Sequence, residues 1–446
     1  MRATRRALAF LACGWFAVFA APAHADLFEY LKRPEPAAHW QKRSEREAAN
    51  ARVVEVELVS QVWRGIPWRH DLRILRPANP SPPDLALLVV TGRGESWIAD
   101  EQSFVAETGI TLAVLGGVPN QPLFRRREDG LVAYTFEQYL KSEDDEWPLL
   151  FPMTKAAVSA MDAIAELSHR EWGQEVGRFV VTGASKRGWT SWLTGAADRR
   201  VAGIAPMVFD NLSFGPQMKN QLAVWGRYSD QLGDYSERGL QALIETERGR
   251  KLVSMVDPYA YRDSLARIPK LIVNGSNDPY WELDAVNFYW QDLAGAKSLL
   301  YVPNAGHEAP ADARVTATLA AFVRRVSEGR RMPELRWLAV EPSRVSMTAD
   351  EAPGAVRVWQ AESASRDFRG ARWTPLSTRR EGDQFLADLK QASAFVALFA
   401  EADYRDRGRA FTLSTPVRIL PHGTRARAAS SCPPFAHSSS WSQCLR

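Results

Sequence analysis

Cysteine is scarce in this chain. Only three cysteines occur among 446 residues: Cys13 lies in an N-terminal apolar segment, and Cys432 and Cys444 lie near the C-terminus. The last two could close one small loop at most, so the sequence excludes a disulfide-stapled scaffold and offers no thiol nucleophile beside any motif. Glycine and proline number 28 and 27, which excludes a collagen-like protein.

A strong charge imbalance is absent as well. The formal net charge is +4, and Arg2, Arg5 and Arg6 precede any acidic residue, so the chain without its N-terminal segment is nearly neutral. A neutral surface argues against a nucleic-acid-binding protein. The mean hydropathy of −0.29 argues against a polytopic membrane protein. Hydrophobic residues still make up 46 % of the chain, enough for a large core.

Residues 1–25 have the three parts of a signal peptide. Basic residues at positions 2–6 precede the apolar run 7–21, and Pro22-Ala23-His24-Ala25 provides small residues for cleavage. We predict cleavage after Ala25 and export to the periplasm or the medium. A permanent membrane helix is less favoured because the run is short and ends in proline and polar residues, so no stable membrane span is expected.

Apolar runs and helical periodicity alternate through residues 26–330. Continuous apolar runs predict buried parallel strands at 85–90, 110–115, 179–181, 204–209, 270–273 and 298–302. Helices are predicted at 154–172 behind an N-cap at Thr154, and at 189–197, 282–293 and 312–326, whereas 26–50 is polar and helix-prone. This alternation predicts an α/β doubly wound, mostly parallel sheet of the α/β-hydrolase type, with a hairpin around Gly65 at its antiparallel edge.

Three further segments interrupt or follow that domain. The charged and aromatic stretch 124–151 is interpreted as a surface excursion, and 211–268 as a helical cap over the ligand-binding edge of the sheet. Short strands separated by turns predict a small β-sandwich at 331–420. The last residues, 421–446, are rich in Ser, Arg and Pro and are predicted to be a disordered tail.

Ser185 is the strongest catalytic candidate. It follows the strand Val180-Val181-Thr182 and the small residues Gly183-Ala184, and a helical pattern follows it. This is the layout of a nucleophile elbow, in which small neighbours let a strained turn lift the hydroxyl above the sheet. The second glycine of G-x-S-x-G is replaced by Arg187, and Gly188 comes one position later. The alternative is that Ser185 caps the helix N-terminus.

The chain order supports catalysis. A serine needs a neighbouring base and an orienting carboxylate, and hydrolases of this fold place acid and then histidine after later strands. Asp278 follows the strand at 270–273, and His307 follows the strand at 298–302. Histidine is rare, with seven in all, so its presence at this place is informative. Asp210 is the rival acid, and Asp284 is a third, less favoured one.

Backbone N–H groups must stabilise the oxyanion of such a reaction. We predict one at Lys186, directly after the serine, and a second in the loop Gly92-Arg93-Gly94. Arg187 and Trp189 are predicted to contact the substrate. The cationic Lys186-Arg187 pair favours an acidic or sugar-linked substrate by analogy with glucuronoyl esterases, although ion pairs with acidic residues explain Arg187 equally well.

Other chemistries fit less well. The segment 183–190 has the glycine spacing of a P-loop, but Trp189 replaces the required lysine. Gly92-Arg93-Gly94 lacks the third glycine of a dinucleotide site. His307-Glu308 has no second histidine at zinc-protease spacing, and no calcium loop is evident. We therefore expect neither a metal nor a cofactor.

Several blocks together resemble the PhoPQ-activated pathogenicity-related family. The resemblance runs from about residue 27 to 420 and rests on Val118-Pro119-Asn120-Gln121-Pro122, Glu128-Asp129, Ala133-Tyr134-Thr135, Trp147-Pro148, Pro152-Met153-Thr154-Lys155-Ala156, Gly183-Ala184-Ser185-Lys186-Arg187-Gly188-Trp189 and Asn274-Gly275-Ser276-Asn277-Asp278. It implies an exported α/β-hydrolase-like protein that is linked to virulence by the family name. It implies no particular substrate.

Two functions remain open at this stage. The first is an exported serine hydrolase that cleaves a small-molecule, peptide or carbohydrate ester or amide through an acyl-enzyme on Ser185, His307 and Asp278. The second is a catalytically silent secreted factor, associated with virulence or signalling, that binds a partner on a hydrolase scaffold. The missing elbow glycine favours the second function, and the complete Ser, Asp and His set favours the first. The oligomeric state is left open.

Overall fold

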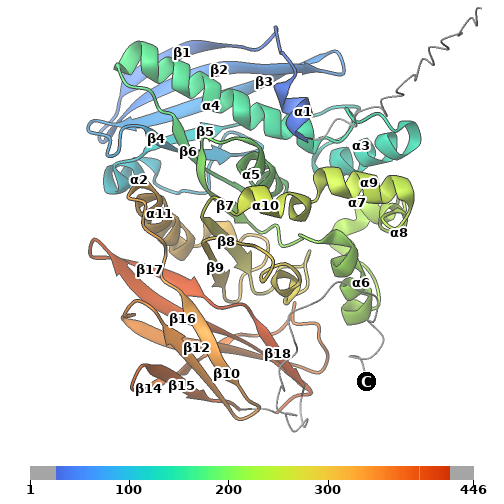
Figure 1. Cartoon of the computed structure of the whole chain (residues 1–446), viewed down its shortest axis with the longest axis vertical. Coiled ribbons are helices and arrows are strands. Elements are labelled where there is room, and N and C mark those ends of the chain that lie inside the picture. Colours follow the sequence, from blue (N-terminus) through green and yellow to red (C-terminus); the bar gives the residue numbers. More distant parts are fainter. Residues whose placement is uncertain (1–26, 391, 422–446) are drawn as a thin grey trace, which may run out of the picture.

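The computed structural model describes residues 27–390 and 392–421 (Figure 1). The predicted signal peptide, Cys432 and Cys444 lie outside the described residues, as does the predicted tail except for Pro421 at the end of the last strand. No helix within the described residues is long and apolar enough to cross a membrane.

A twisted mixed sheet forms the centre of the molecule. Its strands follow the order β1-β2-β3-β5-β4-β6-β7-β8-β9. From β5 onwards the strands are parallel, whereas β1, β2 and β3 form antiparallel pairs at one edge. The bounds are β1 (His39–Glu47), β2 (Ala51–Trp63), β3 (Ile66–Pro77), β4 (Leu85–Val90), β5 (Thr111–Leu115), β6 (Arg178–Ala184), β7 (Val201–Met207), β8 (Lys270–Gly275) and β9 (Lys297–Val302).

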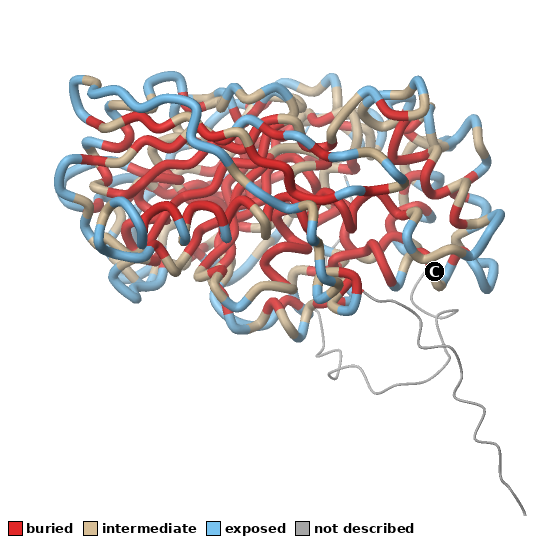
Figure 2. The backbone as a smooth tube through the Cα atoms, turned by 90° about the horizontal axis from the view of Figure 1, so that it is seen from above, coloured by how far each residue is buried: buried red, intermediate tan, exposed pale blue. Residues whose placement is uncertain are grey.

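Helices cover both faces of this sheet, as the predicted doubly wound fold requires. On β4, Leu88 and Val90 belong to a core with α4 (Leu150–Trp172) and α5 (Lys186–Ala197). The alternate residues Leu87 and Val89 belong to a second core with α2 (Glu101–Thr108) and α11 (Ala313–Ser327). Successive side chains of a strand point to opposite faces, so a continuous apolar strand needs both layers. Figure 2 shows the buried residues gathered in this interior. The strand order and the helices on both faces are those of an α/β-hydrolase.

The cap region consists of short helices, as predicted. It contains α6 (Phe214–Trp225), the 3-10 helix η1 (Asp230–Leu232), α7 (Gly233–Ser236), α8 (Leu240–Leu243), α9 (Glu247–Val256), the 3-10 helix η2 (Pro258–Tyr261) and α10 (Arg262–Leu265). Helix α3 (Glu128–Ser142) lies beside α7 and α9 in Figure 1 and contacts both. The interpretation of 124–151 as a surface excursion was therefore wrong, because Leu131 and Tyr139 are fully buried.

Three local predictions also need correction. Residues 26–50 hold only a short helix, α1 (Leu27–Lys32), and then the exposed edge strand β1, where charged side chains protect an open sheet edge. Thr154 lies inside α4, which begins at Leu150, and its hydroxyl donates to the Leu150 carbonyl. The helix predicted at 282–293 is reduced to the 3-10 helix η3 (Ala285–Phe288).

The C-terminal strands form two facing sheets. One contains β10 (Leu335–Val340), β11 (Arg344–Ala349), β14 (Arg379–Glu381) and β15 (Gln384–Asp388). The other contains β12 (Ala355–Ser363), β13 (Thr374–Ser377), β16 (Phe395–Asp406), β17 (Arg409–Ser414) and β18 (Arg418–Pro421). Met347 of the first sheet and Leu398 of the second belong to one core. The second sheet continues the central sheet, because Ser414 of β17 pairs with Leu299 of β9.

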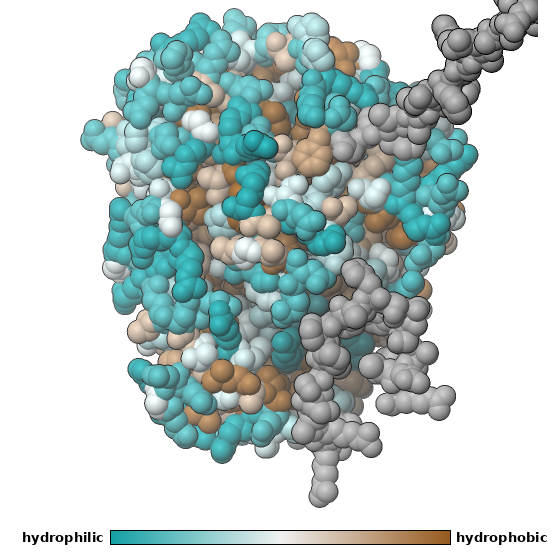
Figure 3. All heavy atoms as spheres, in the orientation of Figure 1, coloured by the Kyte–Doolittle hydropathy of each residue, from teal (hydrophilic) through white to brown (hydrophobic). Residues whose placement is uncertain are grey.

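The surface of this view is largely hydrophilic, with scattered apolar residues (Figure 3). Leu338 of β10 is one of few large apolar side chains exposed among the described residues, with 51 % of its surface accessible.

Candidate active site

Ser185 occupies the turn between β6 and α5. Its backbone angles are φ 57° and ψ −127°, and its N–H donates to the Met207 carbonyl at 2.9 Å. A non-glycine residue adopts a positive φ only when its surroundings enforce it, and such strain concentrates at functional sites. The Ser185 side chain makes no capping hydrogen bond to α5, so the structure contradicts the alternative role of Ser185 as a helix cap.

Two glycines make this turn possible. A Cβ at Gly183 would lie 2.4 Å from the Arg187 carbonyl oxygen, and one at Gly188 would lie 2.8 Å from the Met207 carbonyl oxygen. Each glycine therefore permits a close backbone approach that any side chain would prevent. Because Gly188 has no side chain, the first turn of α5 packs directly on β7. The tight turn at Ser185 therefore forms although position 187, where the G-x-S-x-G motif has its second glycine, holds an arginine.

Asp278 and His307 meet beyond β8 and β9. His307 Nδ1 lies 2.8 Å from Asp278 Oδ2, and the other oxygen, Oδ1, accepts the N–H of Tyr280 at 2.9 Å. The Asp278 side chain is 6 % exposed and the imidazole 25 % exposed. Because β6, β8 and β9 are parallel, their carboxyl ends share one edge of the sheet, and Ser185 lies at that same edge. A buried carboxylate on Nδ1–H orients the ring and leaves Nε2 as the proton acceptor.

The two rival carboxylates have other partners. Asp210 accepts hydrogen bonds from the Tyr289 hydroxyl at 2.5 Å and from Asn274 Nδ2 at 2.9 Å. Burial raises the pKa of Asp210 to about 8. Asp284 forms an ion pair with Arg366 at 2.7 Å. Of the three candidate acids, only Asp278 is hydrogen bonded to His307 in the described structure.

Tyr280 was missed by the sequence analysis. Its ring lies on the His307 imidazole, with ring centres 4.2 Å apart and planes inclined by 30°. Tyr280 and Ser185 both line the same pocket, whereas the described residues show no hydrogen bond between the Ser185 hydroxyl and His307. Tyr280 therefore separates the pocket from the face of the imidazole. The only sequence signal was its position two residues after Asp278.

The predicted oxyanion donors lie at the ends of β4 and β6. Lys186 is the first residue of α5, where backbone N–H groups have no acceptor within the helix. In the second loop, the Gly94 N–H donates to Thr91 Oγ1 at 2.9 Å. This bond leaves Gly92 and Arg93 as the loop's candidate donors. Gly92 has a packing role as well, because a Cβ there would lie 2.3 Å from an Arg187 guanidinium nitrogen.

Both cations beside the serine are paired with acidic residues of α3. Arg187 donates to both oxygens of Glu128, at 2.7 and 2.9 Å, and to the Val118 carbonyl at 2.6 Å. Lys186 Nζ lies 2.9 Å from Glu128 and 3.3 Å from Asp129. Burial alone would raise the pKa of Glu128, but the hydrogen bonds and charges of Arg187 and Lys186 hold that pKa far below its usual range. These contacts match the ion-pair interpretation of Arg187.

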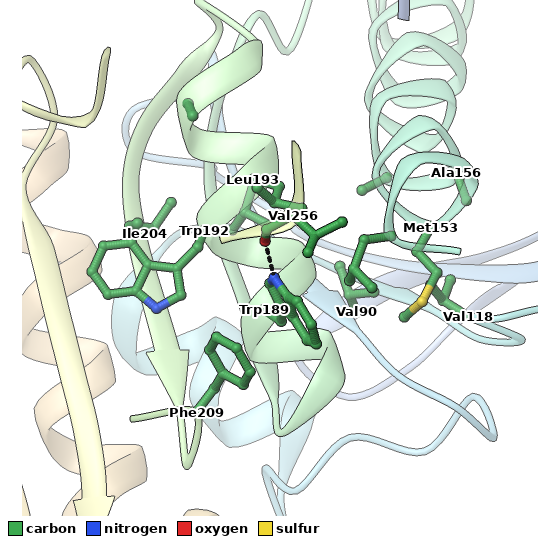
Figure 4. Close-up of a cluster of buried hydrophobic side chains, with 14 of the residues drawn as sticks. Val90, Val118, Met153, Ala156, Trp189, Trp192, Leu193, Ile204, Phe209 and Val256 are labelled. Atoms are coloured by element: carbon green, nitrogen blue, oxygen red, sulfur yellow. Dashed lines mark hydrogen bonds between the residues drawn. The ribbon is translucent and has the colours of Figure 1, made fainter. Parts of the chain in front are cut away.

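Ser185 opens into a pocket between the sheet edge and the cap. The pocket has a cavity volume of about 90 Å³, and Trp189 and Phe209 form part of its wall. These two rings stack with centres 4.8 Å apart, and the Trp189 indole N–H donates to the Val256 carbonyl at 2.5 Å (Figure 4). The predicted substrate contact Trp189 thus lines the same pocket as Ser185.

Asp257 joins two segments of the cap to each other. Its buried carboxylate accepts the backbone N–H groups of Ser213 at 3.2 Å, Phe214 at 2.9 Å and Tyr259 at 2.9 Å. Burial raises the pKa of Asp257 to about 7, and the three hydrogen bonds act in the opposite direction. One side chain therefore ties the start of α6 to η2.

We expect Asp257→Ala to lower the free energy of unfolding by about 2 kcal/mol, because three buried N–H groups lose their acceptor. Urea denaturation would measure this loss. Asp257→Asn keeps one acceptor oxygen, so its free energy of unfolding should fall by less than that of the alanine variant. Equal stability of the alanine variant and the wild type would contradict this role of Asp257.

Within residues 27–390 and 392–421, no group of three or more His, Cys, Asp or Glu side chains is arranged to hold a metal ion.

Two comparisons with known proteins show the family of this chain, and a third found distantly similar solved structures. The model of the PhoPQ-activated pathogenicity-related protein family matches residues 27–369. Autocrine proliferation repressor protein A of Dictyostelium discoideum is 30 % identical over 379 residues, which cover 77 % of this chain and 76 % of that protein. Among solved structures, an acetyl xylan esterase from Paenibacillus sp. R4 has a TM-score of 0.44 and 14 % identity, covering 63 % of this chain and 85 % of its own. A glucuronoyl esterase from Solibacter usitatus has a TM-score of 0.40 and 14 % identity, and the match covers 66 % of this chain and 87 % of that esterase chain.

Proposed function

This chain belongs to the PhoPQ-activated pathogenicity-related protein family, and we propose that it is an exported serine hydrolase that cleaves an ester or amide bond through an acyl-enzyme. The observation that carries the proposal is the hydrogen bond of 2.8 Å between His307 Nδ1 and Asp278 Oδ2. This pair lies at the same sheet edge as Ser185, whose positive φ is that of a nucleophile elbow.

The proposed reaction follows from these positions. The Ser185 hydroxyl attacks the substrate carbonyl, and its proton passes to His307 Nε2 while Asp278 accepts the Nδ1–H. The N–H of Lys186, with one from Gly92 or Arg93, stabilises the oxyanion. The imidazolium then protonates the leaving group, and the acyl-enzyme forms. Water, deprotonated by the same imidazole, releases the acid and restores the serine.

The serine and the imidazole must come within hydrogen-bond distance for proton transfer. Catalytic hydrogen bonds of free enzymes are often long and shorten when substrate binds. Tyr280, which lies on the imidazole and lines the pocket, is the side chain whose movement would join the two groups.

A fluorophosphonate probe tests this function. We expect the wild type to form a covalent adduct that mass spectrometry maps to Ser185, and we expect Ser185→Ala to remain unlabelled. Ser191→Ala, which removes a serine on the same helix, is the matched control and should label like the wild type. A properly folded wild type that stays unlabelled, while a known serine hydrolase labels under the same conditions, would overturn the proposal.

The second candidate is a secreted factor that binds a partner without catalysis. The name of the Dictyostelium relative, a proliferation repressor, favours it. The same labelling experiment separates the two functions, because a catalytically silent scaffold would leave Ser185 unreactive.

A further inference from the structure

The walls of the pocket at Ser185 are predominantly apolar. They include Phe136 of α3, Phe214 and Met218 of α6, and Leu252, Val253 and Val256 of α9. The cap and α3 thus supply most of a hydrophobic enclosure. Trp189 and Phe209, whose rings stack on each other (Figure 4), also line it. Such an enclosure stabilises a ligand by removing apolar surface from water.

The charged groups at the pocket are already paired with one another. Lys186 contacts Glu128 and Asp129, and Asp129 also accepts the Tyr235 hydroxyl at 3.2 Å. An acidic substrate would have to displace these carboxylates from partly buried cations, which is costly. Because Lys186 and Arg187 are already paired with carboxylates, their charges no longer favour the prediction of an acidic or sugar-linked substrate.

We propose that this pocket holds the apolar acyl chain of a short-chain ester. The inference rests on the proposed function, because the chain must enter with its carbonyl at Ser185. The cavity volume of about 90 Å³ is smaller than the ~150 Å³ of an apolar cavity that binds benzene, which favours chains of about four to six carbons. Each methylene group that becomes buried should raise kcat/KM about four-fold until the pocket is full.

A series of p-nitrophenyl esters tests the proposal with a constant leaving group. We expect kcat/KM to rise at least ten-fold from the acetate to the hexanoate and to fall again for the dodecanoate. A steady decrease from the acetate onwards, in an enzyme that does cleave the acetate, would overturn the proposal.

Variants at Val253 make the test specific to this pocket. Val253→Trp should fill the cavity and lower the hexanoate-to-acetate ratio of kcat/KM about ten-fold. Val253→Ala enlarges the cavity and should move the optimum to longer chains, and it remains informative if the tryptophan does not fold. Leu338→Trp places the same side chain on exposed β10 and should leave the ratio unchanged. Unchanged chain preference in both Val253 variants would overturn the proposal.

A binding experiment separates failure of this inference from failure of the proposed function. In Ser185→Ala, hexanoate should raise the melting temperature more than acetate does, and the further change Val253→Trp should abolish the difference. In one outcome, the wild type fails to react with the probe while hexanoate still raises the melting temperature in a way that Val253→Trp abolishes. That result would contradict the proposed hydrolase function and support the assignment of the pocket to an apolar chain. If Ser185 is labelled but chain length affects neither rate nor melting temperature, the pocket assignment fails alone.

Discussion

Replacement of Asp278 by asparagine is expected to lower turnover by about four orders of magnitude while leaving the fold intact. His307 Nδ1 lies 2.8 Å from this carboxylate. Under the proposed mechanism the carboxylate accepts the Nδ1–H and so fixes the tautomer in which Nε2 can take the serine proton. An asparagine in the same place can donate its amide N–H to Nδ1, which leaves the proton on Nε2, where it blocks the base. Steady-state kinetics on the best ester of the series would measure the loss, and a thermal melt would confirm folding.

Asp210→Asn is the matched control for this experiment. Asp210 is also buried and lies after the neighbouring strand β7, but it is hydrogen bonded to Tyr289 and Asn274. Burial raises the pKa of Asp210 and so favours its protonated form, which asparagine resembles. We expect less than a ten-fold change in turnover. If Asp210→Asn lost activity and Asp278→Asn did not, Asp210 would be the catalytic acid.

Asp406→Ala should cause the largest loss of stability, about 3–5 kcal/mol. Asp406, at the end of β16, has a side chain that is 1 % exposed and lies 2.8 Å from Arg324 and 3.5 Å from Arg325 of α11. Those arginine side chains are themselves 3 % and 2 % exposed. Removing the carboxylate leaves two buried cations with fewer partners at the junction of α11 and the C-terminal strands. Urea unfolding at pH 7 would measure the change.

The control for this experiment is Asp388→Ala. Asp388 also binds two arginines, Arg344 at 2.8 Å and Arg379 at 2.9 Å, but its side chain is 59 % exposed. Water screens these two ion pairs, so we expect no measurable loss of stability in Asp388→Ala. Equal stabilities of the Asp406 and Asp388 variants would show that the buried pair does not fasten the C-terminal strands to α11.

Short-range patterns were sufficient for much of the fold and for the Ser185 turn. Continuous apolar runs such as Leu85–Val90 indicate strands buried on both faces, because no other arrangement hides every side chain. The small residues Gly183 and Ala184 before Ser185 indicate a tight strand-to-helix turn, because their effect is steric and local. Local patterns gave wrong predictions for two segments. The charged residues of α3 suggested a surface segment although one face of the helix is buried, and the charged residues of β1 suggested a helix although they lie on an exposed edge strand.

Pairings between distant residues depended on the tertiary structure. The sequence left Asp278 and Asp210 as rival acids, since both follow apolar strands, and only the packing of the loops gives the His307 hydrogen bond to Asp278. The sequence also left open whether Arg187 contacts a substrate or forms an ion pair. Only the position of α3 brings Glu128 within hydrogen-bond distance of Arg187. The sequence by itself determined the order of the strands along the chain and the turn that presents Ser185, because backbone sterics and apolar periodicity act over a few residues. The tertiary structure decided which charges neutralise one another and that the cap encloses an apolar pocket, because those contacts join segments that only folding brings together.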